Sequence, residues 1–171
     1  MAYTIRPART RDVPMIRKLI DSNVESGRLL SKATVTLYED VQEFCVAELV
    51  DDASLAGCGA LHVMWEDLAE IRTVAVVPDQ QALGIGHAIV GELLARARVL
   101  GVHRVFCLTF AVDFFARHGF QPISGTPVAA EVYSELLRSY DEGVAEFLDL
   151  ERVKPNTLGN TRMLLRLLPE R

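Results

Sequence analysis

Apolar residues follow two different rhythms in the middle of the chain. From Ile71 to Val77 the residues are mostly apolar or β-branched, which is typical of a buried strand. Pro78 has no N–H for a strand ladder, so we expect the strand to end there. From His87 the apolar residues recur at steps of three and four, the period of a helix with one buried face. The pattern therefore predicts a strand and a helix that ends near Leu100, joined by a short loop.

The same analysis predicts elements along the rest of the chain in the order β-α-α-β-β-β-α-β-α, followed by a tail. Strands are expected at Tyr3–Arg6, Phe44–Val50, Leu55–Met64, Val105–Phe110 and Met163–Leu168. Helices are expected from Val13 to Ile20 (capped by Thr10 or Asp12), at Thr34–Glu43, at Asp113–His118 and within Val128–Glu151. A break is expected over Ser22–Ser31, and turns at Asp51–Ser54 and Lys154–Asn156.

This order of elements indicates an α/β (α+β) fold. A meander of strands followed by a helical crossover favours a mixed sheet with helices on both faces. We find no internal repeat, low-complexity stretch or linker in the sequence. The sequence therefore predicts one domain over residues 1–171.

Composition narrows the class of protein. The chain has 171 residues, of which 50% are hydrophobic and 24% charged, as in ordinary globular proteins. Its net charge of −5 argues against nucleic-acid binding. No apolar run approaches the ~18 residues of a membrane span, and no signal segment begins the chain, so a cytoplasmic protein is expected.

The cysteines and the acidic pairs suggest no special chemistry. Cys45, Cys58 and Cys107 are far apart and lie in strand-like runs, so buried free thiols are expected and no metal site. The acidic pairs Glu39-Asp40 and Asp51-Asp52 are interpreted as solvated surface or turn.

The loop before the long helix has the layout of a phosphate site. The first N–H groups of a helix have no internal partner, the helix dipole adds positive charge there, and glycines allow close approach. The alternative is an ordinary tight turn. Ile89 stands where a dinucleotide fingerprint needs glycine, and no Gly-Lys-Ser/Thr of a P-loop occurs. What remains is Gln-x-x-Gly-x-Gly, formed by Gln81, Gly84 and Gly86.

This loop resembles the pyrophosphate loop of the GCN5-related N-acetyltransferases, which bind acetyl-coenzyme A. Phe114–Phe120, an aromatic pair followed by Gly-Phe, resembles the second coenzyme A motif of that family. The resemblance implies the family's fold, a mixed central sheet with helices on both faces. In that fold a splayed strand pair holds the cofactor arm.

A narrower resemblance points to the acetyltransferase domain of the N-acetylglutamate synthases. These enzymes acetylate the α-amine of glutamate at the first step of arginine biosynthesis. The runs that carry it are Gly27–Leu30, Leu37–Glu39, Glu43-Phe44, Gly57–Leu61, Ala69–Ile71, Ala75-Val76 and Phe114–Phe120.

The resemblance implies roles for residues on the cofactor side. The loop should hold the pyrophosphate and the strand before it should pair with the pantetheine arm. The implied cofactor-binding residues are Gln81, Ala82, Leu83, Gly84, Ile85, Gly86 and His87 of the loop, Val74, Ala75 and Val76 of the strand, and Phe115. Two groups are implied in catalysis: the carbonyl of Thr73 accepts a hydrogen bond from the attacking amine, and the N–H of Val74 stabilises the oxyanion.

The resemblance also implies five residues that bind the acceptor amino acid. Leu30 and Lys32 match the segment that lines the glutamate site, Thr161 matches a contact in the last strand, and Arg28 and Arg72 are further cations for the two carboxylates. Without the resemblance, Lys32 and Arg28 are ordinary solvated charges. Arg72 lies in an apolar strand, where an isolated charge is costly, so a partner is expected.

One further residue of this region is judged from its position alone. His62, in the predicted strand Leu55–Met64, is interpreted as a hydrogen-bonded histidine of the core or of the sheet edge.

The sequence departs from the family at two positions. Phe115 stands where many members carry a tyrosine that protonates the leaving thiolate, and Ala82 stands where glycine is common. These departures favour one alternative, a non-catalytic acyl-coenzyme A sensor. A change at one pocket residue would give the other alternative, an acetyltransferase acting on glutamine or another small amino acid.

The resemblance also bears on assembly and regulation. Larger N-acetylglutamate synthases carry an amino-acid-kinase-like domain that senses arginine. This chain has no room for such a domain, so we expect no feedback by that route. The family often forms homodimers, but nothing in the sequence marks an interface.

Overall fold

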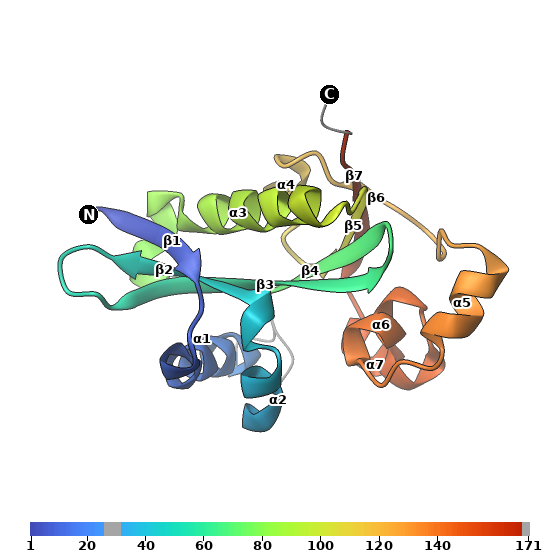
Figure 1. The fold of residues 1–171 in the computed structure, drawn as a ribbon, viewed down its shortest axis with the longest axis horizontal. Coiled ribbons are helices and arrows are strands. Elements are labelled where there is room, and N and C mark those ends of the chain that lie inside the picture. Colours follow the sequence, from blue (N-terminus) through green and yellow to red (C-terminus); the bar gives the residue numbers. More distant parts are fainter. Residues whose placement is uncertain (26–31, 169–171) are drawn as a thin grey trace. The chain divides into compact units, whose positions relative to one another are not determined.

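The computed structural model describes residues 1–25 and 32–168. Seven strands form a sheet in the order β1-β2-β3-β4-β5-β7-β6 (Figure 1). Their bounds are β1 Tyr3–Pro7, β2 Phe44–Leu49, β3 Leu55–Trp65, β4 Leu68–Val76, β5 Arg104–Thr109, β6 Gln121–Pro122 and β7 Thr161–Arg166. Strands β4 and β5 are parallel, whereas β1 with β2 and β5 with β7 are antiparallel. The mixed sheet predicted from the sequence is confirmed.

The helices connect these strands, and the contacts divide the chain into two compact units. The helices are α1 Val13–Glu25, α2 Thr34–Glu39, α3 Ile85–Leu100, α4 Val112–Ala116, α5 Ala130–Leu136, α6 Glu142–Phe147 and α7 Lys154–Thr157, with 3-10 turns η1 Thr10–Asp12, η2 Val41–Glu43, η3 Pro78–Leu83 and η4 Glu151–Val153. The first unit comprises Met1–His62 and Ile71–Val99, and the second comprises Val63–Glu70 and Leu100–Arg171.

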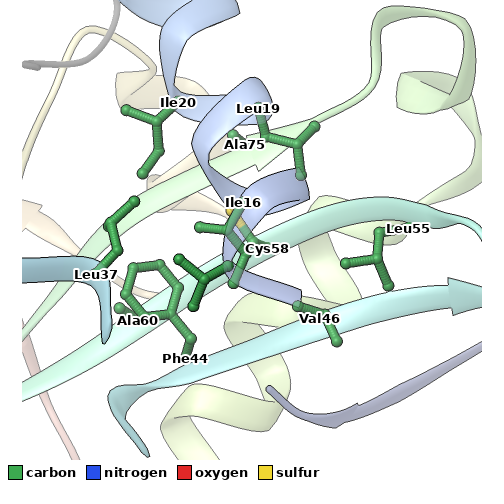
Figure 2. Packing of buried hydrophobic residues seen from close by; sticks show 11 residues of the cluster. Ile16, Leu19, Ile20, Leu37, Phe44, Val46, Leu55, Cys58, Ala60 and Ala75 are labelled. Carbon is green, nitrogen blue, oxygen red and sulfur yellow. The ribbon is translucent and has the colours of Figure 1, made fainter. Parts of the chain in front are cut away.

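In the first unit, α1 and α2 cover one face of the sheet. Val13, Ile16 and Ile20 of α1 are at most 1% exposed, because the three- and four-residue spacing places them on one side of the helix. They pack in one cluster with Phe44 of β2 and Cys58 of β3 (Figure 2). The apolar face predicted for this helix is therefore the face that forms the core.

Helix α3 covers the opposite face of the same strands (Figure 1). Successive residues of a strand point to opposite sides, so Gly57 and Gly59 face away from the cluster that contains Cys58. A Cβ at residue 59 would lie 2.6 Å from Cγ2 of Ile89, and one at residue 57 would lie 3.0 Å from Cδ1 of the same side chain. The helix therefore sits at a distance from β3 that only glycine allows.

The second unit has its own core. Phe106 of β5 and Phe147 of α6 are fully buried and meet edge to face at 5.1 Å between ring centroids. The guanidinium of Arg162 lies over the Phe106 ring and donates to the carbonyls of Glu146 and Phe147 at the end of α6. This arginine therefore ties β7 to the C-terminus of α6, where positive charge is favoured.

Several predicted boundaries in the first unit are wrong. The break expected over residues 22–31 does not begin at Ser22, because α1 continues to Glu25; residues 26–31 lie outside the described part of the chain. The helix expected to reach Glu43 ends at Glu39, because Asp40 leaves the helical region (φ −97°, ψ 9°) and a 3-10 turn turns the chain into β2. Helix α3 begins at Ile85 rather than His87, because Gly84 at φ +75° ends the preceding turn.

The tail departs further from the prediction. The helical pattern of Val128–Glu151 is divided into α5 and α6, and the carboxylate of Asp141 caps α6 by accepting from the N–H of Val144. Residues Lys154–Thr157 form a short helix instead of the expected turn. Strand β6 was missed, because two residues carry no periodicity.

The close packing of α3 gives a prediction on stability. Replacing Gly59 by alanine should lower the free energy of unfolding by about 2 kcal/mol, because Ile89 is β-branched and its Cγ2 cannot swing away within a helix. Thermal unfolding should show a fall in Tm of about 4 to 8 °C for a chain of this size.

Gly91 is the matched control. It lies in the interior of α3, and a Cβ there would meet nothing within 4 Å. Gly91→Ala should therefore raise the stability by about 0.5 to 1 kcal/mol, as expected for a helix interior. Equal stability changes in the two variants would show that α3 has room to move off β3.

Candidate functional site

Strand β4 is irregular at its centre. Thr73 adopts φ +59° although it is β-branched and only 7% exposed, a conformation that such residues rarely take. The ladder between β4 and β5 covers three pairs and ends at Glu70 and Phe106. The residues of β4 predicted to bind the cofactor lie after this point, and Arg72, Val74 and Val76 alternate with buried neighbours. The strained peptide therefore coincides with the position predicted for catalysis.

The carbonyl oxygen of Thr73 already has one neighbour. The thiol of Cys58 lies 3.5 Å from it and donates to it from β3. A carbonyl oxygen has two lone pairs, so this contact leaves acceptor capacity for a second donor. The role of Thr73 and of the Val74 N–H stays a prediction.

The loop after β4 presents backbone groups at the start of a long helix. The first backbone bond of α3 runs from the N–H of Ala88 to the carbonyl of Gly84 at 3.0 Å. The N–H groups of Ile85, Gly86 and His87 therefore precede the first turn and have no acceptor within the helix. Gly84 has φ +75°, and a Cβ there would meet nothing within 4 Å. The geometry fits a pyrophosphate held by backbone N–H groups, with open space above the glycine.

The same loop is fixed by one buried side chain. Ile85 is fully buried, and its Cγ2 would lie 3.2 Å from a Cβ at residue 57. Gln81, Ala82 and Leu83, in contrast, are exposed, and Gly86 and His87 are half-buried. The predicted cofactor residues thus form a surface loop anchored by Ile85 to β3.

The first unit also contains a group of charged side chains from segments that are distant along the sequence. We call Lys32, Asp40, Glu43, His62 and Arg72 the polar cluster. The Nδ1 atom of His62 lies 2.6 Å and 3.1 Å from the two carboxylate oxygens of Glu43, which confirms the predicted hydrogen-bonded histidine.

Asp40 joins the remaining members electrostatically. Burial raises the pKa of the Asp40 carboxyl and the charge of Glu43 raises it further, while Lys32, Arg72 and His62 act in the opposite direction. The same carboxylate is therefore influenced by the charges of Lys32 and Arg72, two cations that the sequence placed in the acceptor site. Asp40 lies in a turn, which is one of the two predicted environments, but its side chain is half-buried in a charge cluster rather than fully solvated. Its neighbour Glu39 is exposed, as are Asp51 and Asp52.

The backbone around the polar cluster is held by two arginines. Arg17 of α1 donates to the carbonyl of Lys32. Arg96 of α3 donates to the carbonyls of Glu43 and Phe44, both at 3.3 Å. The Nε atom of Arg72 is shielded from solvent. The roles of Asp40 and Glu43 in this cluster were not predicted from the sequence. Their position near the predicted end of a helix was the only available signal.

The predicted residues of the second unit have structural partners there. Phe115 is 7% exposed and packs edge to face on Phe114 and Phe120. Thr161 pairs with Thr109 across β7 and β5. Their contacts with cofactor and acceptor stay predictions. Arg28 and Leu30 lie outside the described residues.

A glutamate and the three cysteines are also buried. Glu70 is 4% exposed at the end of the β4–β5 ladder, and sequence analysis gave it no role of its own. A buried carboxylate is a common acid or base of active sites, and an acidic residue inside an apolar run was the available signal. The three cysteines are buried and free, as expected, and burial raises the pKa of Cys45 and Cys58 to about 12.

No group of three or more histidines, cysteines or acidic residues within 1–25 and 32–168 is arranged to hold a metal ion. Over the same residues, none of the helices has both the length and the apolar character of a membrane span.

Comparison with known sequences gives consistent matches. Residues 14–120 match the model of the acetyltransferase (GNAT) family. An amino-acid acetyltransferase of Mycobacterium tuberculosis is 63% identical over 94% of this chain and 92% of its own length. An amino-acid acetyltransferase of Neisseria meningitidis is 37% identical over 71% of this chain, but the match covers 28% of that protein.

Comparison with solved structures agrees. Rv2747 from Mycobacterium tuberculosis, in complex with CoA and NLQ, matches with a TM-score of 0.94 and 62% identity, over 96% of this chain and 99% of that one. N-acetylglutamate synthase from Neisseria gonorrhoeae, complexed with coenzyme A and N-acetyl-glutamate, matches with a TM-score of 0.76 and 27% identity. That match covers 98% of this chain and 36% of the synthase, so this chain spans about a third of the larger protein.

Proposed function

Since this chain belongs to the GNAT acetyltransferase family, we propose that it acetylates the α-amine of L-glutamate, as an N-acetylglutamate synthase. The family match confirms the resemblance inferred from the two motifs, and with it an enzyme that uses acetyl-coenzyme A. The observation that carries the choice of an amino acid is the 63% identity to an amino-acid acetyltransferase over almost its full length. The proposal puts the reaction in the cytoplasm, at the first step of arginine biosynthesis.

The first unit supplies a binding surface for the cofactor. The N–H groups of Ile85, Gly86 and His87 would hold the pyrophosphate, and open space above Gly84 admits it. The backbone of Val74, Ala75 and Val76 would pair with the pantetheine arm as an added strand does. Acetyl-coenzyme A, when bound, supplies the acetyl group as a reactive thioester.

The strained segment of β4 positions the acceptor amine. The α-amine of an amino acid has a pKa of about 8, so a fraction is neutral near pH 7 and the main task is orientation. The carbonyl of Thr73 would accept a hydrogen bond from this amine, and the N–H of Val74 would stabilise negative charge on the carbonyl oxygen under attack. The unusual φ of Thr73 supports this role, because backbone strain is concentrated at functional sites.

The polar cluster would recognise the carboxylates of the acceptor. Lys32 and Arg72 are its permanent cations, and both act on Asp40, so they lie in one electrostatic environment. Arg28, Leu30 and Thr161 complete the acceptor site in the proposal.

No acid is assigned to the leaving thiolate. Phe115 is a buried hydrophobic residue and has no proton to donate. A thiol of pKa near 8.5 is a tolerable leaving group, so departure unaided or through water is consistent with the chemistry.

Glutamine is the second candidate acceptor. It differs from glutamate by one charge, and the polar cluster contains acidic as well as basic side chains. A cluster of mixed sign can accommodate an amide as well as a carboxylate.

The proposal is tested by thiol release from acetyl-coenzyme A with each of the twenty amino acids as acceptor. Release with glutamate, or with glutamate and glutamine, would support it and rank the two. Thiol release with a different amino acid only would identify that amino acid as the acceptor in place of glutamate. Binding of the cofactor without thiol release on any amino acid would favour a non-catalytic acyl-coenzyme A sensor.

Gly84→Val tests the cofactor loop. The new side chain would occupy the open space above the loop, so we expect the Kd for coenzyme A to rise at least about tenfold, or about 1.4 kcal/mol, in a calorimetric titration.

Gly101→Val is the matched control for backbone strain. Gly101 has φ +85° just after the other end of α3, with nothing within 4 Å of a Cβ, so valine is strained there in the same way. Unchanged binding in this variant, with weakened binding in Gly84→Val, would locate the phosphate at the loop. A similar loss in both would assign the effect to strain alone.

Lys32→Ala tests the acceptor side. We expect the KM for glutamate to rise about 10- to 100-fold, because a charge-assisted hydrogen bond is worth roughly 1.5 to 3 kcal/mol. The Kd for coenzyme A should stay within about twofold, as it should in the control Lys18→Ala on the exposed side of α1. A collapse of coenzyme A binding in Lys32→Ala would contradict the assignment.

A further inference from the structure

The polar cluster contains one histidine. His62 and Glu43 are in direct contact through Nδ1, and the two side chains are 23% and 22% exposed. Histidine is the residue that ordinarily titrates between about pH 5 and pH 8. Because this contact joins β3 to η2, the His62 ring is held at a fixed position in the cluster.

The charged groups of the cluster come from several elements. Glu43 lies in η2, Asp40 at the end of α2, Lys32 before α2 and Arg72 on β4. Arg96 of α3 reaches the carbonyl of Glu43 and is itself paired with Glu92 at 3.9 Å. Within the cluster, Lys32 and Arg72 balance Asp40 and Glu43. The protonation state of His62 therefore decides whether the cluster is neutral or carries one net positive charge.

We propose that His62 determines the preference of the acceptor site between a side-chain carboxylate and a side-chain amide. The inference rests on the proposed function, in which Lys32 and Arg72 of the same cluster bind the acceptor. A protonated His62 favours the acceptor with a side-chain carboxylate, and a neutral His62 removes that advantage. His62 is a specificity-determining residue in this account and takes no part in the acetyl transfer itself.

Glutamate and glutamine isolate this effect because they differ by a single charge at nearly constant size. Both present the same α-amine and α-carboxylate, so the pH dependence of cofactor binding and of amine attack largely cancels in the ratio of their kcat/KM values. The ratio for glutamate over glutamine should rise as the pH falls, since protonation adds positive charge beside the carboxylate. One unit charge acting through partly solvated surroundings gives a change on the order of fivefold.

The experiment measures this ratio in the intact chain from about pH 8.5 to about pH 6, the range in which histidine changes charge. His62→Gln should make the ratio independent of pH. Glu43→Gln should reduce the step, because it removes the carboxylate that holds the His62 ring in place through Nδ1. His103→Gln is the matched control, since His103 is an exposed histidine of the second unit and should leave the step unchanged.

Asp40→Asn separates His62 from the other group that titrates in the cluster. Burial raises the pKa of Asp40, so its protonation would change the ratio in the same direction. A step that survives in Asp40→Asn and disappears in His62→Gln supports the inference.

Three results would overturn it. These are a flat ratio in the unaltered chain, a step that persists in His62→Gln, and a step that is lost in Asp40→Asn only. Failure of both amino acids to accept the acetyl group at any pH would instead reject the proposed function, and this inference with it.

Discussion

The fit of α3 against two glycines of β3 is the constraint on which the first unit depends. A side chain at residue 57 would meet Ile85 and Ile89 of the helix as well as the carbonyl of Ala75 on β4. One small residue thus sets the position of the helix N-terminus relative to the strand that carries Thr73. The C-terminal half of the helix positions a second segment, because Arg96 donates hydrogen bonds to the carbonyls of Glu43 and Phe44, where η2 leads into β2. The cofactor loop and the polar cluster are therefore positioned by the same helix.

The strain at Thr73 shows how tertiary packing overrides local preference. Threonine is a good strand residue, and the apolar run around it predicts an uninterrupted strand. In the structure β4 runs from Leu68 to Val76, but Thr73 within it takes φ +59°, with the residue buried and its carbonyl in contact with Cys58. Conflict between a local preference and the observed conformation is expected at a functional site, where the surrounding structure can hold a strained residue in place. The same conflict explains why the positive φ angle of Thr73 could not be predicted from any pattern in the sequence.

What could be predicted from the sequence follows from the range of the interactions. The strand, loop and helix around Gly84 were predictable because Pro78, the glycines and the apolar period act within a few residues. The end of α3 was predictable for the same reason, since Gly101 has the positive φ typical of a C-terminal cap. The environment of Asp40 was not, because Lys32, His62 and Arg72 reach it from three other segments. The division of the tail into α5 and α6 was also not predicted, because Asp141 acts as a helix cap only when the chain turns there.

In the proposed function, cofactor and acceptor are recognised by different kinds of groups, and this has a consequence for specificity. The cofactor loop acts through backbone N–H groups, so most of its side chains can vary if Gly84 keeps its conformation and Ile85 its packing. The polar cluster acts through side chains, and its two cations and two carboxylates nearly cancel. When large opposite charges nearly cancel, a change of one unit decides the sign of the remainder. Under the proposed function, a single substitution or protonation in the cluster would therefore redirect acceptor choice, while the backbone groups proposed to hold the cofactor remain as they are.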